Sequence, residues 1–434
     1  IAIQNFMLAL VSATDAIMLG WIDQTSLSAV SLAGQVQFVL SLFISGIAAG
    51  AGIMAAQYWG KRDAASIEKV IPIALRTNLL FSGLFTILAG FCPEILMRIF
   101  TNDAALVASG SQYLRAVALS YVLCGISQVY LILLKNTGHA AVSSRISSTA
   151  VVLNIILNAI LIYGLCGAPA LGIRGAAYAT VAARVVELIW AYLETKKPER
   201  VRILWNRLFS SAGKILSEDF WRYTLPVLAA SLVWGIAYVL YSVIMGHMGS
   251  DAVAANSITS IAKSLLSCLI RGVSGGAGVL IGNLLGANEL EKAREYGGRL
   301  SHLSIAIGIV TGGLLMLISP AIVHFAPLSD TAAEYLQYML LFCGLNLMAQ
   351  SVNTTVLDGI FCAGGDAKFD MQGNIGAMWC FSVPLGFLAA FWLKLPVMVV
   401  YCIVNLDEIV KLPAVYHHYK KYIWVRNITR DVED

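Results

Sequence analysis

The chain has 434 residues, of which 58% are hydrophobic and 12% are Asp, Glu, Lys or Arg, and its formal net charge is +4. A soluble globular chain carries about 25% charged residues, so this composition excludes a soluble domain and is typical of a polytopic membrane protein. The small positive excess is explained by loops that face the inside of a membrane, and we expect no nucleic-acid partner.

Twelve apolar segments are long enough to cross a bilayer, for which a helix needs about 20 residues. We therefore predict an all-α polytopic membrane protein, whose short connections leave no room for a soluble domain. No cleavable signal peptide is visible. In chain order, the expected helices cover residues 1–22, 30–58, 70–97, 109–136, 143–165, 171–195, 219–247, 253–285, 296–323, 333–363, 369–393 and 396–418.

The placement of Lys and Arg predicts which way the helices run. Basic residues gather in the even-numbered connections, among them Lys61, Arg62, Lys196 and Lys197, and are few in the odd ones. Both chain ends should therefore be cytoplasmic, and we expect the protein in the plasma (inner) membrane of a prokaryote. The C-terminal tail HHYKKYIWVRNITR (417–430) is expected to form a basic, aromatic helix at the cytoplasmic leaflet.

The eight cysteines lie singly along the chain, mostly within the expected helices. The sequence contains no CxxC pair and no metal-ligand spacing. We therefore predict no disulfide, no structural metal and no cofactor.

The two halves of the chain are similar to each other. Residues 20–60 align without gaps to residues 246–286, an offset of 226 positions, with 11 of 41 positions identical and five of these being paired glycines. Six expected helices separate the copies, so both halves face the same way, as in transporters built from parallel repeats. We predict an N-lobe of residues 1–195 and a C-lobe of residues 219–434 that includes the basic tail, each with six helices, joined by a cytoplasmic linker of residues 196–218.

Asp15 lies inside the first expected helix, in the stretch IAIQNFMLALVSATDAIMLGWI (1–22). A carboxylate in the middle of a membrane costs about 2.5–3.5 kcal/mol on insertion scales and is rarely kept without a function. The usual function is to bind or relay a proton or a cation. Asp15 is therefore a candidate ion-coupling residue, against the alternative that it belongs to an inert buried hydrogen-bond cluster.

Five motifs lie in order along the chain: TDAIMLG (14–20), GIAAGAGIMAAQYWGKRD (46–63), IMGHMGSDAVAANSI (244–258), GAGVLIGNLLGANELEKARE (276–295) and DGIFCAGGDAKF (358–369). In this order and spacing they resemble the multidrug and toxic compound extrusion (MATE) family, and the resemblance covers essentially the whole chain. It implies a 12-helix, two-lobe exporter of the MATE/MOP-type fold. Such an exporter exchanges an outward-moving drug-like molecule, commonly an organic cation, for inward-moving H⁺ or Na⁺.

The resemblance also implies a cation site in the N-lobe. Asp15 matches the family's carboxylate on the first helix. Asn154 and Asn158 match a polar pair on the fifth helix, and Thr180 matches a hydroxyl ligand on the sixth. The two asparagines are four residues apart and so point to one face of their helix. These groups suit either a proton held on Asp15 or a dehydrated Na⁺ bound there, and a single carboxylate leans towards H⁺.

The chain departs from the family at three positions. Some members have Asp where this chain has Asn158, so a second N-lobe carboxylate is missing. Members of the NorM type carry C-lobe acids on the seventh and tenth helices, where this chain has Trp234 and Ser351. The C-lobe cation site should therefore be absent or rebuilt from other groups.

Other charged and aromatic residues also fall within expected helices. For the charges, internal ion pairs that fix a lobe are one explanation, and a polar lining that contacts substrate or relays ions is the other. The aromatic rings either attract organic cations through their π faces or serve in packing. The candidate substrate-cavity residues are Tyr121, Tyr130, Trp234, Tyr238, Tyr241, Lys263, Arg271 and Asp358, and the further intramembrane charges are Arg184, Glu187, Asp407, Glu408 and Lys411.

We predict a secondary active multidrug efflux transporter that works as a monomer, contacts membrane lipids and exchanges small-molecule substrates for H⁺ or Na⁺. The alternative in the same superfamily is a flippase for a lipid-linked saccharide. A membrane enzyme acting on lipid intermediates would need a catalytic cluster near the interface, and none is apparent, so we expect no enzymatic activity. A non-transporting sensor would need a soluble signalling domain, for which there is no room.

Overall fold

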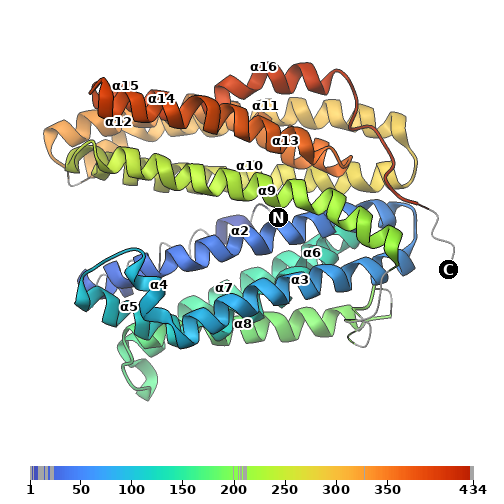
Figure 1. The fold of residues 1–434 in the computed structure, drawn as a ribbon, viewed down its shortest axis with the longest axis horizontal. Helices are drawn as coiled ribbons and strands as arrows, with labels where there is room; N and C mark the ends of the chain where they lie inside the picture. The colour runs from blue at the N-terminus through green and yellow to red at the C-terminus, as the bar shows by residue number, and fades with distance from the viewer. Residues whose placement is uncertain are drawn as a thin grey trace. The chain divides into compact units, whose positions relative to one another are not determined.

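The computed structural model of the protein describes residues 2, 4–7, 14, 18, 19, 24–198, 200–203, 205, 208, 213–326 and 328–430. Every element drawn in these ranges is a helix (Figure 1). Asp15 and most of the first expected helix lie outside the described residues. The chain divides into two compact units, which we call the N-unit (Phe6–Leu228) and the C-unit (Ile1–Asn5 with Ala229–Asp431).

The helices of the N-unit begin and end where the sequence supplies caps. Asp63 accepts a hydrogen bond from the backbone N–H of Ser66 at the start of α3, and Asp103 accepts one from Ala105 at the start of α5. The helices are α2 (Gln24–Gly60), α3 (Ala64–Phe91), α4 (Pro93–Arg98), α5 (Ala104–Val117), α6 (Leu119–Leu134), η1 (Lys135–His139), α7 (Ala140–Tyr163), η2 (Leu165–Gly167) and α8 (Ile173–Thr195).

The C-unit combines long helices with three π-helical segments, η4, η5 and η6. Such wider turns are rare and occur frequently at functional sites. The elements are α9 (Lys214–Gly246), which begins in the N-unit, α10 (Ser250–Gly286), α11 (Leu290–Phe325), α12 (Asp330–Thr354), η4 (Thr355–Phe361), α13 (Ala367–Asn374), η5 (Ile375–Ser382), α14 (Val383–Phe387), η6 (Leu388–Trp392), α15 (Val397–Val404) and α16 (Asp407–Tyr419).

The observed helices match the expected membrane spans. Within the described residues, nine segments are long and apolar enough to cross a membrane. One of them, Leu119–Tyr163, holds two expected helices, α6 and α7, joined across the non-helical residues Thr137 and Gly138. The twelfth expected helix is interrupted after Val404 and forms α15 and α16. These segments account for eleven of the twelve predicted helices, and the first lies largely outside the described residues.

Two glycines related by the internal repeat make equivalent close contacts. A β-carbon on Gly46 would lie 2.9 Å from the Cα atom of Leu228 in the N-unit, and one on Gly272 would lie 2.6 Å from the Cα atom of Ala2 in the C-unit. In the sequence, Gly46 and Gly272 are 226 positions apart, and so are Ala2 and Leu228. The boundary between the units falls inside α9 rather than in the expected linker. The predicted lobe limits stay a prediction.

The C-terminal tail does not form the predicted surface helix. α16 ends at Tyr419, and the tail packs onto the C-unit. Trp424 is fully buried among apolar side chains, and Arg426 donates hydrogen bonds to the carbonyl oxygens of Gly364 and Gly365 at 2.7 and 2.6 Å. The prediction was wrong because these aromatic and basic side chains bind protein groups rather than a lipid surface.

Candidate functional site

Three polar side chains of the predicted N-lobe site lie together between α7 and α8. Asn154 Nδ2 donates a hydrogen bond to Thr180 Oγ1 at 3.3 Å, and Asn158 Nδ2 donates one to Asn154 Oδ1 at 3.3 Å. The exposed fractions of Asn154 and Asn158 are 5% and 0%. A buried polar group left without a partner costs about 1–3 kcal/mol. These bonds therefore allow the three side chains to remain inside an apolar lobe.

The local sequence explains how α7 and α8 bring these side chains together. Asn154 and Asn158 lie one turn apart on one face of α7. Buried alanines of α8, including Ala176 and Ala179, let α7 pack closely along it. The hydroxyl group of Thr180 donates to the backbone oxygen of Ala176 at 3.0 Å. Its lone pairs remain available to accept the bond from Asn154.

The described residues of the first helix contact the same end of α7. The hydroxyl group of Tyr163 donates a hydrogen bond to the backbone oxygen of Met18 at 2.7 Å. Leu19 is 1% exposed and belongs to one apolar cluster with Ile162. Met18 and Leu19 therefore lie beside the C-terminal end of α7, whereas Asp15 lies outside the described residues.

A buried ion pair lies further along the same face of α8. Arg184 and Glu187 follow Thr180 by four and seven residues, a spacing that returns to one helix face. Arg184 Nη1 lies 2.7 Å from Glu187 Oε2, and Ser127 on α6 donates a hydrogen bond to the same oxygen at 3.0 Å. This geometry agrees with the first explanation for these charges, because the pair joins α8 to α6 inside the lobe.

Tyr121 and Tyr130 are packed inside the N-unit. Tyr121 is 2% exposed within an apolar cluster, and the ring of Tyr130 is fully buried next to Tyr192. The hydroxyl group of Tyr130 accepts a hydrogen bond from Trp205 Nε1 at 2.8 Å. Neighbours from their own unit surround both rings, so neither is open to a cavity here. We leave both out of the proposed substrate cavity.

The aromatic candidates of α9 have different surroundings. The rings of Trp234 and Tyr238 stack with centroids 5.6 Å apart and planes 18° apart, and Tyr238 is 40% exposed. Tyr241 packs against an apolar cluster that contains Ile244. Trp234 and Tyr238 can therefore present a π face to a ligand, whereas Tyr241 is partly covered. The cavity role of all three stays a prediction.

Ser351 stands on the tenth helix at the position where NorM-type members are expected to carry an acid, and here it has a packing role. It is buried and donates a hydrogen bond to the backbone oxygen of Ser304 at 2.7 Å. This bond ties α12 to α11.

Lys263 and Arg271, both on α10, differ in their contacts. Lys263 Nζ donates a hydrogen bond to Asn346 Oδ1 at 3.0 Å, and Asn346 Nδ2 donates one to the backbone oxygen of Asn405 at 2.5 Å. Lys263 thus connects α10 and α12 to the break between α15 and α16. Arg271 is exposed, and no described acid forms an ion pair with it. Asp358 on η4 is also exposed.

Two acids of α16 surround a buried lysine. Lys411 Nζ lies 3.6 Å from Asp407 Oδ2 and 3.4 Å from Glu408 Oε1. Lys411 and Asp407 are 5% and 6% exposed. The predicted explanation by internal ion pairs therefore accounts for these three charges.

Two further buried polar residues of the C-unit were not found from the sequence. Asp370 on α13 is buried and accepts a hydrogen bond from Asn374 Nδ2 at 3.1 Å. Asn353 on α12 donates one to Glu408 Oε2 at 2.8 Å. Asn353 follows Asn346 by seven residues, so both lie on one face of an apolar helix, and that spacing is a signal that could have identified them.

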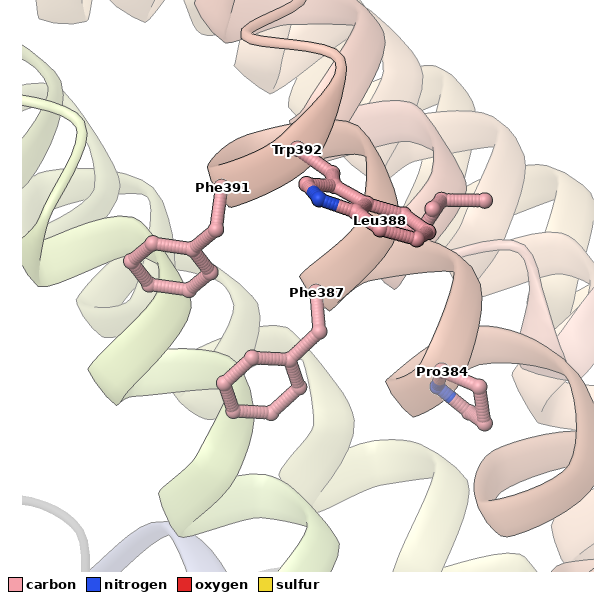
Figure 2. A pocket seen from close by; sticks show the side chains of 5 residues that line it. All are labelled: Pro384, Phe387, Leu388, Phe391 and Trp392. Carbon is pink, nitrogen blue, oxygen red and sulfur yellow. The ribbon is translucent and has the colours of Figure 1, made fainter.

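The C-unit also has a hollow of about 490 Å³ that contains no polar side chain. Figure 2 shows the lining side chains along α14 and η6, where the rings of Phe387 and Phe391 stack with centroids 5.4 Å apart. The lining residues are Pro384, Phe387, Leu388, Phe391 and Trp392. Ligand sites usually combine apolar walls with a few convergent polar groups. This hollow lacks them and suits contact with lipid tails.

The sequence profile of the MatE family matches residues 1–160 and 226–388. The chain belongs to the MatE family. Its relatives include the "Uncharacterized transporter YisQ" of Bacillus subtilis (strain 168), which is 21% identical over 412 residues that make up 95% of this chain and 90% of YisQ. The "Probable multidrug resistance protein NorM" of Agrobacterium fabrum is 24% identical over 87% of this chain and 82% of its own.

Solved structures share the fold of this MatE protein. A multidrug resistance MATE family transporter of the MOP superfamily, in an outward-facing conformation, superposes with a TM-score of 0.87 at 20% identity, covering 97% of this chain and 93% of that chain. A MOP superfamily transporter from Pyrococcus furiosus, whose binding pocket is described as having reverse polarity, gives the same TM-score over 97% and 94%. The predicted all-α MATE/MOP-type membrane fold is thereby confirmed.

Proposed function

We propose that this MatE protein is a secondary active exporter that moves drug-like, mostly cationic organic compounds out of the cell in exchange for H⁺ or Na⁺. The hydrogen-bonded set of Asn154, Asn158 and Thr180 carries the proposal. Polar groups inside a membrane lobe are expensive and usually mark ion or substrate pathways. Relatives named as probable multidrug resistance proteins support the export function.

We assign Asp15 to the same site. In the sequence Asp15 precedes Leu19 by four residues, as Asn158 precedes Ile162, and Leu19 and Ile162 belong to one apolar cluster. Binding of the ion neutralises the carboxylate and favours a state with lower affinity for a cationic drug. The ion shifts the equilibrium between the two states only by its differential affinity for them, so ion binding and drug release are linked.

We rank H⁺ before Na⁺ as the coupling ion. Asn154 Oδ1 and Thr180 Oγ1 each already accept a hydrogen bond. Each oxygen keeps a second lone pair that could bind Na⁺, but the site offers a single carboxylate, which favours a proton. A proton on Asp15 needs only one acceptor for its O–H group.

The remaining parts of the proposal concern residues of the C-unit. The stacked rings of Trp234 and Tyr238 offer π faces to an organic cation, and the exposed carboxylate of Asp358 offers negative charge. Lys263 and Arg271 tune the charge of the same lobe. The protein acts as a monomer in the plasma membrane, with both chain ends in the cytoplasm.

Transport of a fluorescent organic cation in proteoliposomes tests the proposal, with a pH gradient and a Na⁺ gradient imposed separately. The matched variants are Asp15→Asn and Glu94→Gln. Glu94 is an exposed N-unit carboxylate that pairs with Arg115 at 3.5 Å, so its variant controls for the loss of a charge. We expect transport driven by one gradient, lost in Asp15→Asn and kept in Glu94→Gln.

The other outcomes separate the alternatives. Transport at the wild-type rate in Asp15→Asn would overturn the assignment of Asp15. Absence of transport under either gradient would favour the lipid-linked saccharide flippase, and a lipid-scrambling assay in the same vesicles would test it.

A further inference from the structure

The N-unit has a polar hollow of about 650 Å³ that is lined by α4, α5 and the segment joining them. Figure 1 shows both helices at one end of the N-unit. The polar side chains that line the hollow are Glu94, Arg98, Asn102, Ser111, Gln112 and Arg115, and the remaining lining side chains are Ala or Val. The hollow shares no residue with the set of Asn154, Asn158 and Thr180, so it needs a separate explanation.

The spacing of the lining residues explains why the hollow lies between these two helices. Arg98 follows Glu94 by one turn of α4, and Arg115 follows Ser111 by one turn of α5, so each pair lies on one helix face. Met97 is fully buried, and a β-carbon on Gly110 would overlap its side chain, so α4 and α5 pack in close contact there. Two packed helices therefore position the polar side chains.

The hollow carries more positive than negative charge. Arg115 Nη2 lies 3.5 Å from Glu94 Oε1, and because both side chains are exposed, this ion pair contributes little and can open. Arg98 forms no ion pair with a described acid. Asp103 is not a lining residue, and it already accepts hydrogen bonds from two backbone N–H groups of α5. Two guanidinium groups are therefore available to an anion.

The other polar lining side chains supply neutral donors. Neither Asn102 nor Gln112 forms a side-chain hydrogen bond with a described residue. Ser111 is 5% exposed, and its hydroxyl group bonds to no described residue. Water can satisfy all three groups, so the two arginines decide that the ligand is an anion.

The orientation of the helices does not explain these two arginines. Arg98 stands after the third expected helix (70–97), in an odd-numbered connection, where basic residues are few. Arg115 falls within the fourth expected helix (109–136). The bases that orient a membrane protein gather in its cytoplasmic connections, which are the even-numbered ones here. Arg98 and Arg115 therefore have another role.

Apolar side chains beside the hollow favour a lipid headgroup over a soluble anion. Ile95 and Ile99 are exposed, and each directly follows a lining residue of α4 or its end. Leu84, Ile87 and Phe91 are also exposed, and their spacing places them on one face of α3 up to its last residue. This apolar surface suits acyl chains. Arginine binds phosphate through two N–H groups, and basic pockets between membrane helices bind anionic lipid headgroups.

We propose that this hollow binds the phosphate group of an anionic phospholipid, with Arg98 and Arg115 as its ligands. The amide groups of Asn102 and Gln112 donate to other oxygens of the headgroup. Glu94 is not a ligand, because its carboxylate competes with the phosphate for Arg115. The lipid joins α4 to α5 at the edge of the membrane. Its binding does not depend on the proposed export function.

Native mass spectrometry of the detergent-purified protein tests the site, because it measures a dissociation constant for each bound lipid. The probe is phosphatidylglycerol, compared with phosphatidylcholine, whose headgroup also carries a positive charge. Arg98→Gln should weaken the binding of the first phosphatidylglycerol by about tenfold, as expected for the loss of a charge-assisted hydrogen bond. Arg174→Gln is the matched control. It changes an exposed arginine of α8 outside the hollow and should leave the binding unaltered.

A second variant tests the sign of the charge effect. Glu94→Gln removes the competing acid, so it should tighten the binding of phosphatidylglycerol, and weaker binding in this variant would overturn the proposal. Equal affinities for the two lipids, or equal effects of Arg98→Gln and Arg174→Gln, would also overturn it. Displacement of phosphatidylglycerol by sodium phosphate, but not by sodium chloride of the same ionic strength, would assign the hollow to a soluble phosphate instead of a lipid. No readout here requires transport, so failure of the proposed export function would leave the test interpretable.

Discussion

Gly272 contacts Ala2 so closely that a β-carbon on the glycine would lie 2.6 Å from the Cα atom of the alanine. The pair Gly46 and Leu228 repeats this contact in the other half of the chain, 226 positions away for each partner. Small residues let membrane helices approach to backbone contact. The internal repeat is thus visible as one helix crossing used twice, and not only as a set of identical letters.

We expect Gly272→Val to lower the free energy of unfolding by about 1–3 kcal/mol, because overpacking forces the helix away from Ala2. Thermal unfolding in detergent measures the effect. Gly276→Ala is the matched control, since a β-carbon at Gly276 meets no atom within 4 Å. Equal melting temperatures for the two variants would show that the contact with Ala2 does not hold the helix in place.

Thr180→Val should impair ion-driven export and destabilise the protein by about 1–3 kcal/mol, because the amide of Asn154 loses its buried acceptor. Thr77→Val provides the comparison. Thr77 also bonds back to its own helix, to the backbone oxygen of Ile73 at 2.9 Å. If Thr77→Val reduces export as much as Thr180→Val does, the bond to Asn154 has no special role.

Arg184→Met should destabilise the N-unit by about 3–5 kcal/mol, since it leaves the carboxylate of Glu187 buried without its cation. The double variant Arg184→Met with Glu187→Met should recover most of that loss. Removing the exposed pair of Arg115 and Glu94 should change stability by about 0–1 kcal/mol. Denaturation of the three variants in one detergent gives the comparison, and a double variant no more stable than the single one would contradict the prediction.

Arg426→Ala should release the C-terminal tail, because it removes both hydrogen bonds to the carbonyl oxygens of Gly364 and Gly365. Limited trypsin digestion should then cut after Lys420 or Lys421 several times faster than in the wild type, with the products identified by mass spectrometry. Lys292→Ala changes an exposed base on α11 and should leave the cleavage rate unaltered. Unchanged cleavage in Arg426→Ala would mean that burial of Trp424 alone holds the tail.

The helices were predictable because each is a long apolar run bounded by polar residues, and the spacing of Asn154 and Asn158 placed both on one face. Their contact with Thr180 was expected only through the family resemblance, since helix periodicity does not tell which helix packs against which. The break between α15 and α16 was missed because the run around Asn405 stays apolar enough to be counted as one span.

Asp370 and Arg426 were beyond sequence reasoning for a different reason. Asp370 lies in the polar stretch AKFDMQGN, which has the composition of a helix end facing water. Its burial depends on the packing of η4 and η5 against α13. Arg426 looked like an interfacial base because lipid head groups and the carbonyl oxygens of Gly364 and Gly365 attract the same side chain. In both cases, a segment outside the residue's own helix or tail decides its surroundings: η4 and η5 bury Asp370, and Gly364 and Gly365 bind Arg426.

Leu228 and Ala229 are consecutive residues of one helix, α9, yet they belong to different units. No flexible loop separates the units at this point. Pro226 lies two residues before the boundary, and because proline has no N–H, the carbonyl oxygen of Arg222 lacks its usual helical partner. The hydrogen-bond ladder of α9 is therefore interrupted within one turn of this boundary, and the helix resists bending least there.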